Sequence, residues 1–175
     1  MKTKKLLPIL LLTIFSCNIF AQQPKGEVNK LNKAGKKEGL WITKDGGWRS
    51  ETYYKNGLES GISKTFSPKG KLDIFGEYKS GIMTGTWYRF EDTGHLVYSF
   101  RDFTENKNSV IVDGNKFTPE FRCYIICYYT NGNIEREGSV LFFKEDAPDS
   151  DTAINYGEWK YYDESGKLIK TEILK

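Results

Sequence analysis

The feature that most constrains this chain is an internal repeat of glycine pairs. Gly35 and Gly39, Gly57 and Gly61, and Gly81 and Gly85 recur at intervals of 22 and 24 residues. In three units an aromatic residue, a glycine and a leucine follow five, nine and eleven positions after the second glycine. These are Phe66, Gly70 and Leu72, then Phe90, Gly94 and Leu96, and, counted from Gly157, Tyr162, Gly166 and Leu168. A repeat of this period indicates one supersecondary unit stacked along the chain.

The pattern within a unit is typical of a β-hairpin. The later glycine closes a turn such as Ser67-Pro-Lys-Gly70, where a positive φ is needed. After this turn Leu72, Ile74 and Tyr78 alternate with polar residues, which is the period of a strand with one buried face. Outside residues 1–21, no ten-residue stretch keeps the apolar period of a helix. We therefore predict an all-β fold.

A hairpin of this size cannot bury its own apolar face. We therefore expect stacked antiparallel β-hairpin repeats that form one elongated sheet or open solenoid. Trp41, Trp87 and Trp159 each stand two residues after the repeat glycine, which predicts packing between neighbouring units. Residues 104–118 and the acidic residues 144–153 interrupt the repeat, and we expect both to be surface loops.

Two cysteines lie in a degenerate unit that begins at Cys123. The surrounding residues are aromatic and β-branched, which favours a strand. Four residues along a strand separate the Cα atoms of Cys123 and Cys127 by about 13 Å. A disulfide tolerates no more than about 7 Å, so we predict two unpaired thiols packed in the sheet.

The N-terminus has the pattern of a secretory signal peptide. Lys2, Lys4 and Lys5 precede the apolar run Leu6 to Phe15. Ten residues are too few to span a bilayer core of about 30 Å, so we expect no transmembrane segment. Residues 1–21 are therefore predicted to be removed.

Cleavage after Ala21 would leave residues 22–175 as a single hairpin-repeat domain. A lipoprotein-type alternative places the new N-terminus at Cys17. Either route predicts an exported protein, located in the periplasm, in the cell envelope or outside the cell as a secreted protein.

Charge excludes several classes of partner. The chain has 26 basic and 23 acidic residues, and removal of the three N-terminal lysines leaves 23 of each. A neutral mature chain lacks the overall attraction for nucleic acid or for an anionic membrane surface. His95 is the single histidine, which excludes a multi-histidine metal site, and we expect no metal and no organic cofactor.

The repeat resembles a known family. Gly-x-x-x-Gly-x-Trp-x-x-Phe/Tyr, followed by a glycine turn and a leucine, is similar to the MORN-repeat variant of exported bacterial proteins, which includes the YwqK-type antitoxin group. The resemblance covers about Asn32 to Leu174 and departs from Cys123 to Asn155, where the first glycine and the tryptophan are missing. It implies a sheet of stacked hairpins and a binding role without an agreed enzymatic activity.

A catalytic interpretation would have to use His95. Its partner would be a carboxylate such as Glu91 or Asp92, or Cys123 as a nucleophile. However, His95 directly follows the turn glycine, where other units carry Lys71, Asn133 and Lys167. We therefore assign no catalytic residue, and keep a small extracytoplasmic hydrolase or transferase using His95 as an alternative.

The remaining expectation is a non-enzymatic interaction module. Its partner would be a protein, with a glycan or lipid also possible. We expect the contacts on residues 104–118, on residues 144–153 and on neighbouring exposed aromatic residues. An antitoxin-like inhibitor of a partner protein is the alternative that the family resemblance implies.

Overall fold

The computed structural model describes residues 27–144 and 146–174, and all regular structure in these ranges is β. The strands are β1 (Lys30–Leu31), β2 (Lys37–Asp45), β3 (Trp48–Lys55), β4 (Leu58–Phe66), β5 (Leu72–Lys79), β6 (Ile82–Phe90), β7 (Leu96–Glu105), β8 (Val110–Val112), β9 (Asn115–Phe117), β10 (Phe121–Tyr128), β11 (Ile134–Phe142), β12 (Ile154–Tyr162) and β13 (Leu168–Leu174). The all-β prediction is confirmed. The predicted signal peptide, its cleavage site and Cys17 lie outside the described residues.

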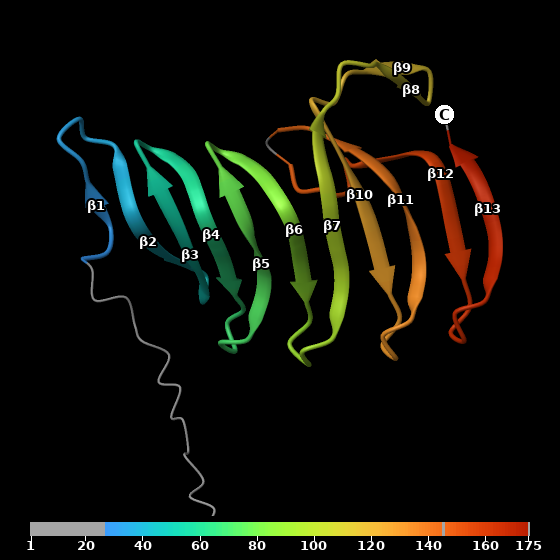
Figure 1. Ribbon diagram of the computed structural model, residues 1–175, viewed down its shortest axis with the longest axis horizontal. Helices are drawn as coiled ribbons and strands as arrows, with labels where there is room; N and C mark the ends of the chain where they lie inside the picture. Colours follow the sequence, from blue (N-terminus) through green and yellow to red (C-terminus); the bar gives the residue numbers. More distant parts are fainter. Residues whose placement is uncertain (1–26, 145, 175) are drawn as a thin grey trace, which may run out of the picture.

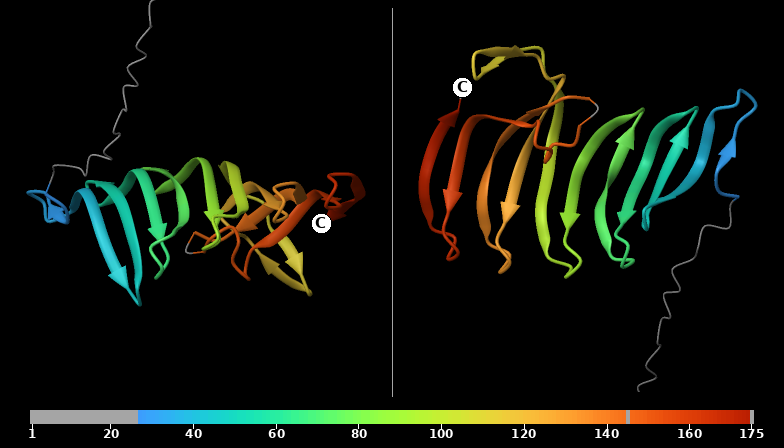
Figure 2. Two further views of the ribbon diagram at one scale, coloured as in Figure 1. Left: turned by 90° about the horizontal axis from the view of Figure 1, so that it is seen from below. Right: turned by 180° about the vertical axis from the view of Figure 1, so that it is seen from behind.

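Eleven strands form one antiparallel sheet that follows chain order from β1 to β7 and then from β10 to β13 (Figure 1). Each hairpin therefore adds to the edge of the preceding one, as the repeat predicts. The sheet twists along its length (Figure 2). It ends at two edge strands, the two-residue β1 and the charged β13.

Two kinds of turn alternate between the two long edges of the sheet. Within each repeat the turn ends in a glycine of positive φ, with values of 74° at Gly70 and 86° at Gly94, which confirms the prediction for these glycines. Between repeats the chain uses two-residue turns in which both residues have positive φ, such as Asn56-Gly57. The two interruptions replace this second kind of turn, so both leave the same edge (Figure 1).

The prediction that residues 104–118 form a loop is wrong in part. Strand β7 continues to Glu105, and β8 and β9 pair in a short hairpin that projects beyond the sheet edge (Figure 1). Asp113 and Gly114 make its turn, with φ of 50° and 79°. An Asp-Gly pair between two short segments that contain apolar residues indicates a hairpin, so the sequence was sufficient to predict this one.

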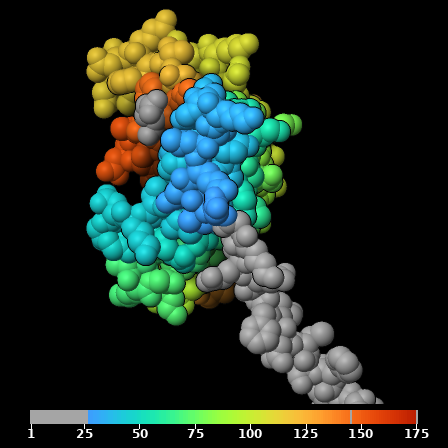
Figure 3. All heavy atoms as spheres, turned by 90° about the vertical axis from the view of Figure 1, so that its left-hand side faces the viewer, coloured from blue at the N-terminus to red at the C-terminus, as the bar shows by residue number. Residues whose placement is uncertain are grey.

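The described residues 143–144 and 146–153 contain no strand, as expected for a loop, but they do not extend into solvent. They fold back over one face of the sheet (Figure 2). Viewed from the N-terminal end, the orange atoms of this region stand out from one side of the sheet, with the yellow β8–β9 hairpin above (Figure 3). Pro148 within this connection is buried.

The core is built around the repeat tryptophans. Trp87 and Trp159 are 4% and 1% exposed, as predicted. Each ring lies against a glycine of the preceding strand, Gly76 or Gly138, where an added Cβ would come within 2.0 Å or 2.4 Å of the ring. The indole N–H of Trp87 donates to the carbonyl of Glu77, and that of Trp159 to Ser139, each over 3.1 Å. Trp41 is half-buried, because the neighbouring strand on its N-terminal side is only the two-residue β1.

The buried apolar cluster occupies only the half of the sheet from β6 to β12. Its members are Trp87, Phe100, Cys123, Ile125, Cys127, Val140, Phe142 and Trp159. Both cysteines are unpaired and 1% exposed, which confirms the prediction for them. This is the half that residues 146–153 cover (Figure 2), so the N-terminal half of the same face remains open.

Candidate functional site

The candidate site lies on the face of the sheet that carries residues 146–153, which we call the loop face. Directly paired residues on neighbouring antiparallel strands point to the same side of a sheet. One continuous row of such pairs crosses the loop face as Thr43, Ser50, Thr65, Ile74, Arg89, Tyr98, Cys127, Arg136, Tyr161 and Lys170. The row therefore changes from small hydroxyl residues at its N-terminal end to cationic and aromatic residues at its C-terminal end.

A second row contains the repeat tryptophans and explains the first of two clefts. Trp41, Thr52, Ser63 and Gly76 are paired in turn across β2 to β5. Ser63 occupies the position two residues after the repeat glycine, where other units carry tryptophan. The loss of an indole side chain leaves the face hollow at this unit.

The resulting hydroxyl cleft has a volume of about 300 Å³. It is lined by Trp41, Thr43, Ser50, Thr52, Tyr54, Glu59, Ser63, Thr65 and Tyr78. The hydroxyls of Thr52 and Ser63 share a hydrogen bond of 2.8 Å, and those of Ser50 and Thr65 one of 3.3 Å. Lys37 Nζ stands at its aromatic wall, 4.8 Å and 4.5 Å from the ring centres of Trp41 and Tyr54.

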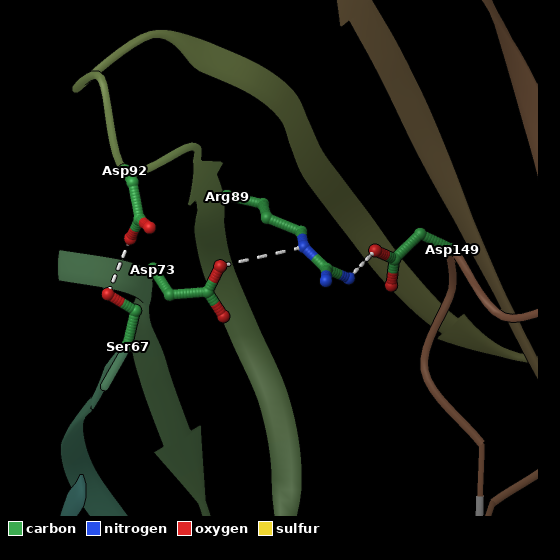
Figure 4. Close-up of polar contacts among 5 residues, drawn as sticks. All are labelled: Ser67, Asp73, Arg89, Asp92 and Asp149. Carbon is green, nitrogen blue, oxygen red and sulfur yellow. Dashed lines mark hydrogen bonds and ion pairs between the residues drawn. The ribbon is translucent and has the colours of Figure 1, made fainter. Parts of the chain in front are cut away.

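A larger cleft of about 630 Å³, which we call the arginine cleft, also lies on the loop face. It is at the edge of the sheet where the turns within the repeats lie. It is lined by Trp48, Ser67, Pro68, Asp73, Arg89, Phe90, Glu91, Asp92, Thr93, Val97, Tyr98 and Asp149. Arg89 lies between two carboxylates (Figure 4). Its Nε is 3.9 Å from Asp73 Oδ1, and its Nη1 pairs with Asp149, whose side chain is only 8% exposed.

The acids of the arginine cleft differ in their electrostatic surroundings. Burial raises the pKa of Asp73, although the charge of Arg89 partly opposes this. The pKa of Asp92 is lowered, first by a hydrogen bond of 2.5 Å from the Ser67 hydroxyl and then by Lys69 (Figure 4). Asp92 therefore keeps its charge to lower pH than Asp73.

The structure keeps His95 in one turn with Glu91 and Asp92 but separates it from Cys123. His95 lies in the turn before β7, where its carbonyl accepts the backbone N–H of Glu91 over 2.9 Å. Cys123 lies beside the other end of β7, between the residues paired with Arg101 and Thr104. About seven strand residues, or roughly 20 Å, separate the two positions. Burial also raises the pKa of the Cys123 thiol to about 12, which disfavours a nucleophilic thiolate.

Within residues 27–144 and 146–174, no group of three or more histidine, cysteine, aspartate or glutamate side chains is arranged to hold a metal ion. In the same ranges no helix is long and apolar enough to cross a membrane.

The last hairpin is similar to a known repeat. Residues 155–174 match the MORN repeat variant. The matched segment is β12 and β13, and it supports a relationship to the MORN-repeat family. Gly157, Trp159 and Gly166 of the matched segment have counterparts at the same spacing in the β6–β7 hairpin, Gly85, Trp87 and Gly94. A comparison with curated proteins found no match.

Two features of the site could not be found from the repeat. Arg89 and Asp149 are 60 residues apart, and no spacing rule links them. Asp73 was expected on the solvent side of an alternating strand, yet it lines the arginine cleft. Ser63 was the detectable signal, because it is the one tryptophan position held by a small hydroxyl residue.

Proposed function

We propose that this protein is an exported, non-enzymatic interaction module that binds a protein partner on the loop face. The observation that carries the proposal is the continuity of the two clefts. Thr65 of the hydroxyl cleft pairs with Ile74, which pairs with Arg89 of the arginine cleft. Together they form an open strip from β2 to β7, about 29 Å wide at roughly 4.8 Å per strand.

The residue types along this strip favour a protein partner. Tryptophan, tyrosine and arginine dominate the energetics of protein interfaces, and the strip presents Trp48, Tyr54 and Arg89. The β8–β9 hairpin adds the exposed apolar residues Ile111 and Phe117 beyond the sheet edge. These exposed side chains agree with the expectation that the interruptions of the repeat contribute contacts.

Export is the part of the proposal that rests on the N-terminal pattern. We expect intact-mass analysis of the exported protein to give a mature chain that begins at Gln22. An N-terminal Cys17 with an acyl adduct would instead show lipoprotein processing. Retention of Met1 in a cytoplasmic protein would contradict export.

Filling the hydroxyl cleft should abolish partner binding while preserving the fold. The variant Thr52→Gly/Ser63→Trp recreates the tryptophan-over-glycine pair seen at Trp87 and Gly76. The added indole would occupy the cleft, so we expect at least a tenfold loss of partner captured from envelope and culture fractions by the mature chain. Ile62→Trp adds the same side chain to the opposite face of β4 and should leave capture unchanged.

Equal capture by both variants would place the binding surface elsewhere. His95→Ala should not affect capture, and a substrate turnover abolished by His95→Ala would contradict the non-enzymatic proposal. An inhibitor role of the YwqK-type antitoxin kind requires that the captured partner loses its own activity when bound. An activity or toxicity assay of that partner tests this special case.

A further inference from the structure

The C-terminal half of the loop face carries a line of cationic and aromatic side chains that begins at Arg89 and Tyr98 of the arginine cleft and continues beyond both clefts. We call Arg89, Tyr98, Cys127, Arg136, Tyr161 and Lys170 the cationic row, since successive members are paired across β6 to β13. Residues 146–152, the acidic segment, lie over part of this row. Pro148, Asp149 and Ser150 line one small cleft together with Tyr98 and Arg136.

The acidic segment is held to the sheet mainly by side chains. Its backbone hydrogen bonds are local, as in Ser150 N–H to the Ala147 carbonyl over 3.0 Å. The Thr152 hydroxyl donates to Asp146 within the segment, over 2.5 Å. Contact with the sheet rests on the Asp149–Arg89 ion pair and on buried Pro148. A segment without backbone pairing to the sheet can be replaced without breaking the sheet ladder.

The acidic segment does not satisfy every cationic group beneath it. Arg136 Nε is buried and has no hydrogen-bond partner among the described residues. A buried guanidinium N–H without a partner costs stability, which a suitable acceptor would recover. A ligand with a second carboxylate in reach of Arg136 would therefore fit this row better than the chain's own segment does.

We propose that the cationic row is a docking surface for an acidic segment of a partner protein, and that residues 146–152 occupy it in cis. The chain's own segment indicates the chemistry of the ligand: a proline next to a carboxylate, packed against arginine and tyrosine side chains. This inference rests on the proposed function for the class of partner, but its test does not require the partner. Covalent linkage gives the segment a local concentration in the millimolar range, so an external ligand must displace it.

The direct test removes the segment and supplies it in trans. Replacing residues 143–152 by Asn-Gly should join β11 to β12 as Asn56-Gly57 joins β3 to β4, because Leu141 already pairs with Ile154. A labelled peptide of the sequence Asp146 to Thr152 is then titrated by fluorescence anisotropy. We expect saturable binding to the shortened protein, weakened by salt, and no binding to the full chain at the same concentrations.

Matched variants separate a specific ion pair from general charge attraction. The peptide carrying Asp149→Asn should bind about fivefold more weakly, whereas Asp151→Asn, which removes an equal charge at an exposed position, should bind as the parent does. In the shortened protein, Arg89→Gln should weaken binding to the same extent. Arg101→Gln, on the opposite face over Tyr124, should not.

Several outcomes would overturn the proposal. One is a folded shortened protein that binds no peptide, and another is equal binding of all peptide variants. Tighter binding of a thymidine oligonucleotide than of the peptide would indicate a nucleic-acid surface instead. Unchanged capture in the cleft-filling experiment, together with the peptide binding expected here, would contradict the role of the hydroxyl cleft and leave the cationic row as the docking surface.

A second measurement applies to the full chain, so the proposal stays testable if the shortened protein does not fold. Asp149→Asn should increase amide hydrogen exchange across residues 146–152 and allow the labelled peptide to bind. Asp151→Asn should do neither. If Asp149→Asn leaves both exchange and peptide binding unchanged, the segment is a fixed part of the core and the proposal is wrong.

Discussion

Replacing Trp159 by alanine should lower the free energy of unfolding by about 3–5 kcal/mol. The side chain is almost fully buried, packs against Gly138, and donates its indole N–H to the Ser139 carbonyl. Alanine would leave a cavity within the apolar cluster and remove the partner of that carbonyl. Urea unfolding followed by far-ultraviolet circular dichroism measures the change, because this signal does not depend on tryptophan emission.

Trp48→Ala is the control for this experiment. Trp48 is 42% exposed at the arginine cleft, so its loss should change the free energy of unfolding by less than about 1 kcal/mol. A Trp159→Ala protein as stable as the parent would contradict the assignment of the repeat tryptophans to the core.

Gly76→Ala should be the more damaging of two glycine substitutions. A Cβ at position 76 would lie 2.0 Å from the Trp87 ring, and the glycine sits in a paired strand that cannot move away freely. We expect a loss of about 3 kcal/mol, at the upper end for overpacking. Gly94→Ala places its Cβ in open space and is strained only by a φ of 86°, so it should cost about 1 kcal/mol.

A double-mutant cycle identifies the cause of the Gly76 effect. In a Trp87→Ala background the ring is absent, so adding Gly76→Ala should cost less than about 1 kcal/mol. Strong additivity of the two substitutions would mean that the glycine is required for another reason. The comparison uses the free energy of unfolding from the same urea transitions.

Several local features of the fold could be predicted from particular residues of the sequence. The positive φ of Gly70 and Gly94 and the burial of Trp87 and Trp159 were predictable, because turn chemistry and strand alternation act over a few residues. The unpaired state of Cys123 and Cys127 followed from strand length alone. The Asp113-Gly114 turn is also a local feature, so the β8–β9 hairpin could have been predicted from the sequence but was not.

The glycines against which the tryptophans pack could be identified only from the register of the sheet. Gly138 precedes Trp159 by 21 residues, whereas Gly76 precedes Trp87 by 11, since residues 143–153 intervene in the first case. Only strand pairing shows that the two glycines are equivalent. Spacing alone therefore predicted the burial of the tryptophans but not which glycines they pack against.

What the sequence determined by itself is the repeating unit: short-range turn and alternation preferences make each unit a hairpin, and a thin hairpin must add to its neighbours. What only the tertiary structure decided is the use of the two faces. Asp149 could pair with Arg89, and Ser63 could open a cleft, only after the register had aligned distant strands. The side on which residues 146–153 pack depends on contacts summed over several strands, and no local pattern encodes that sum.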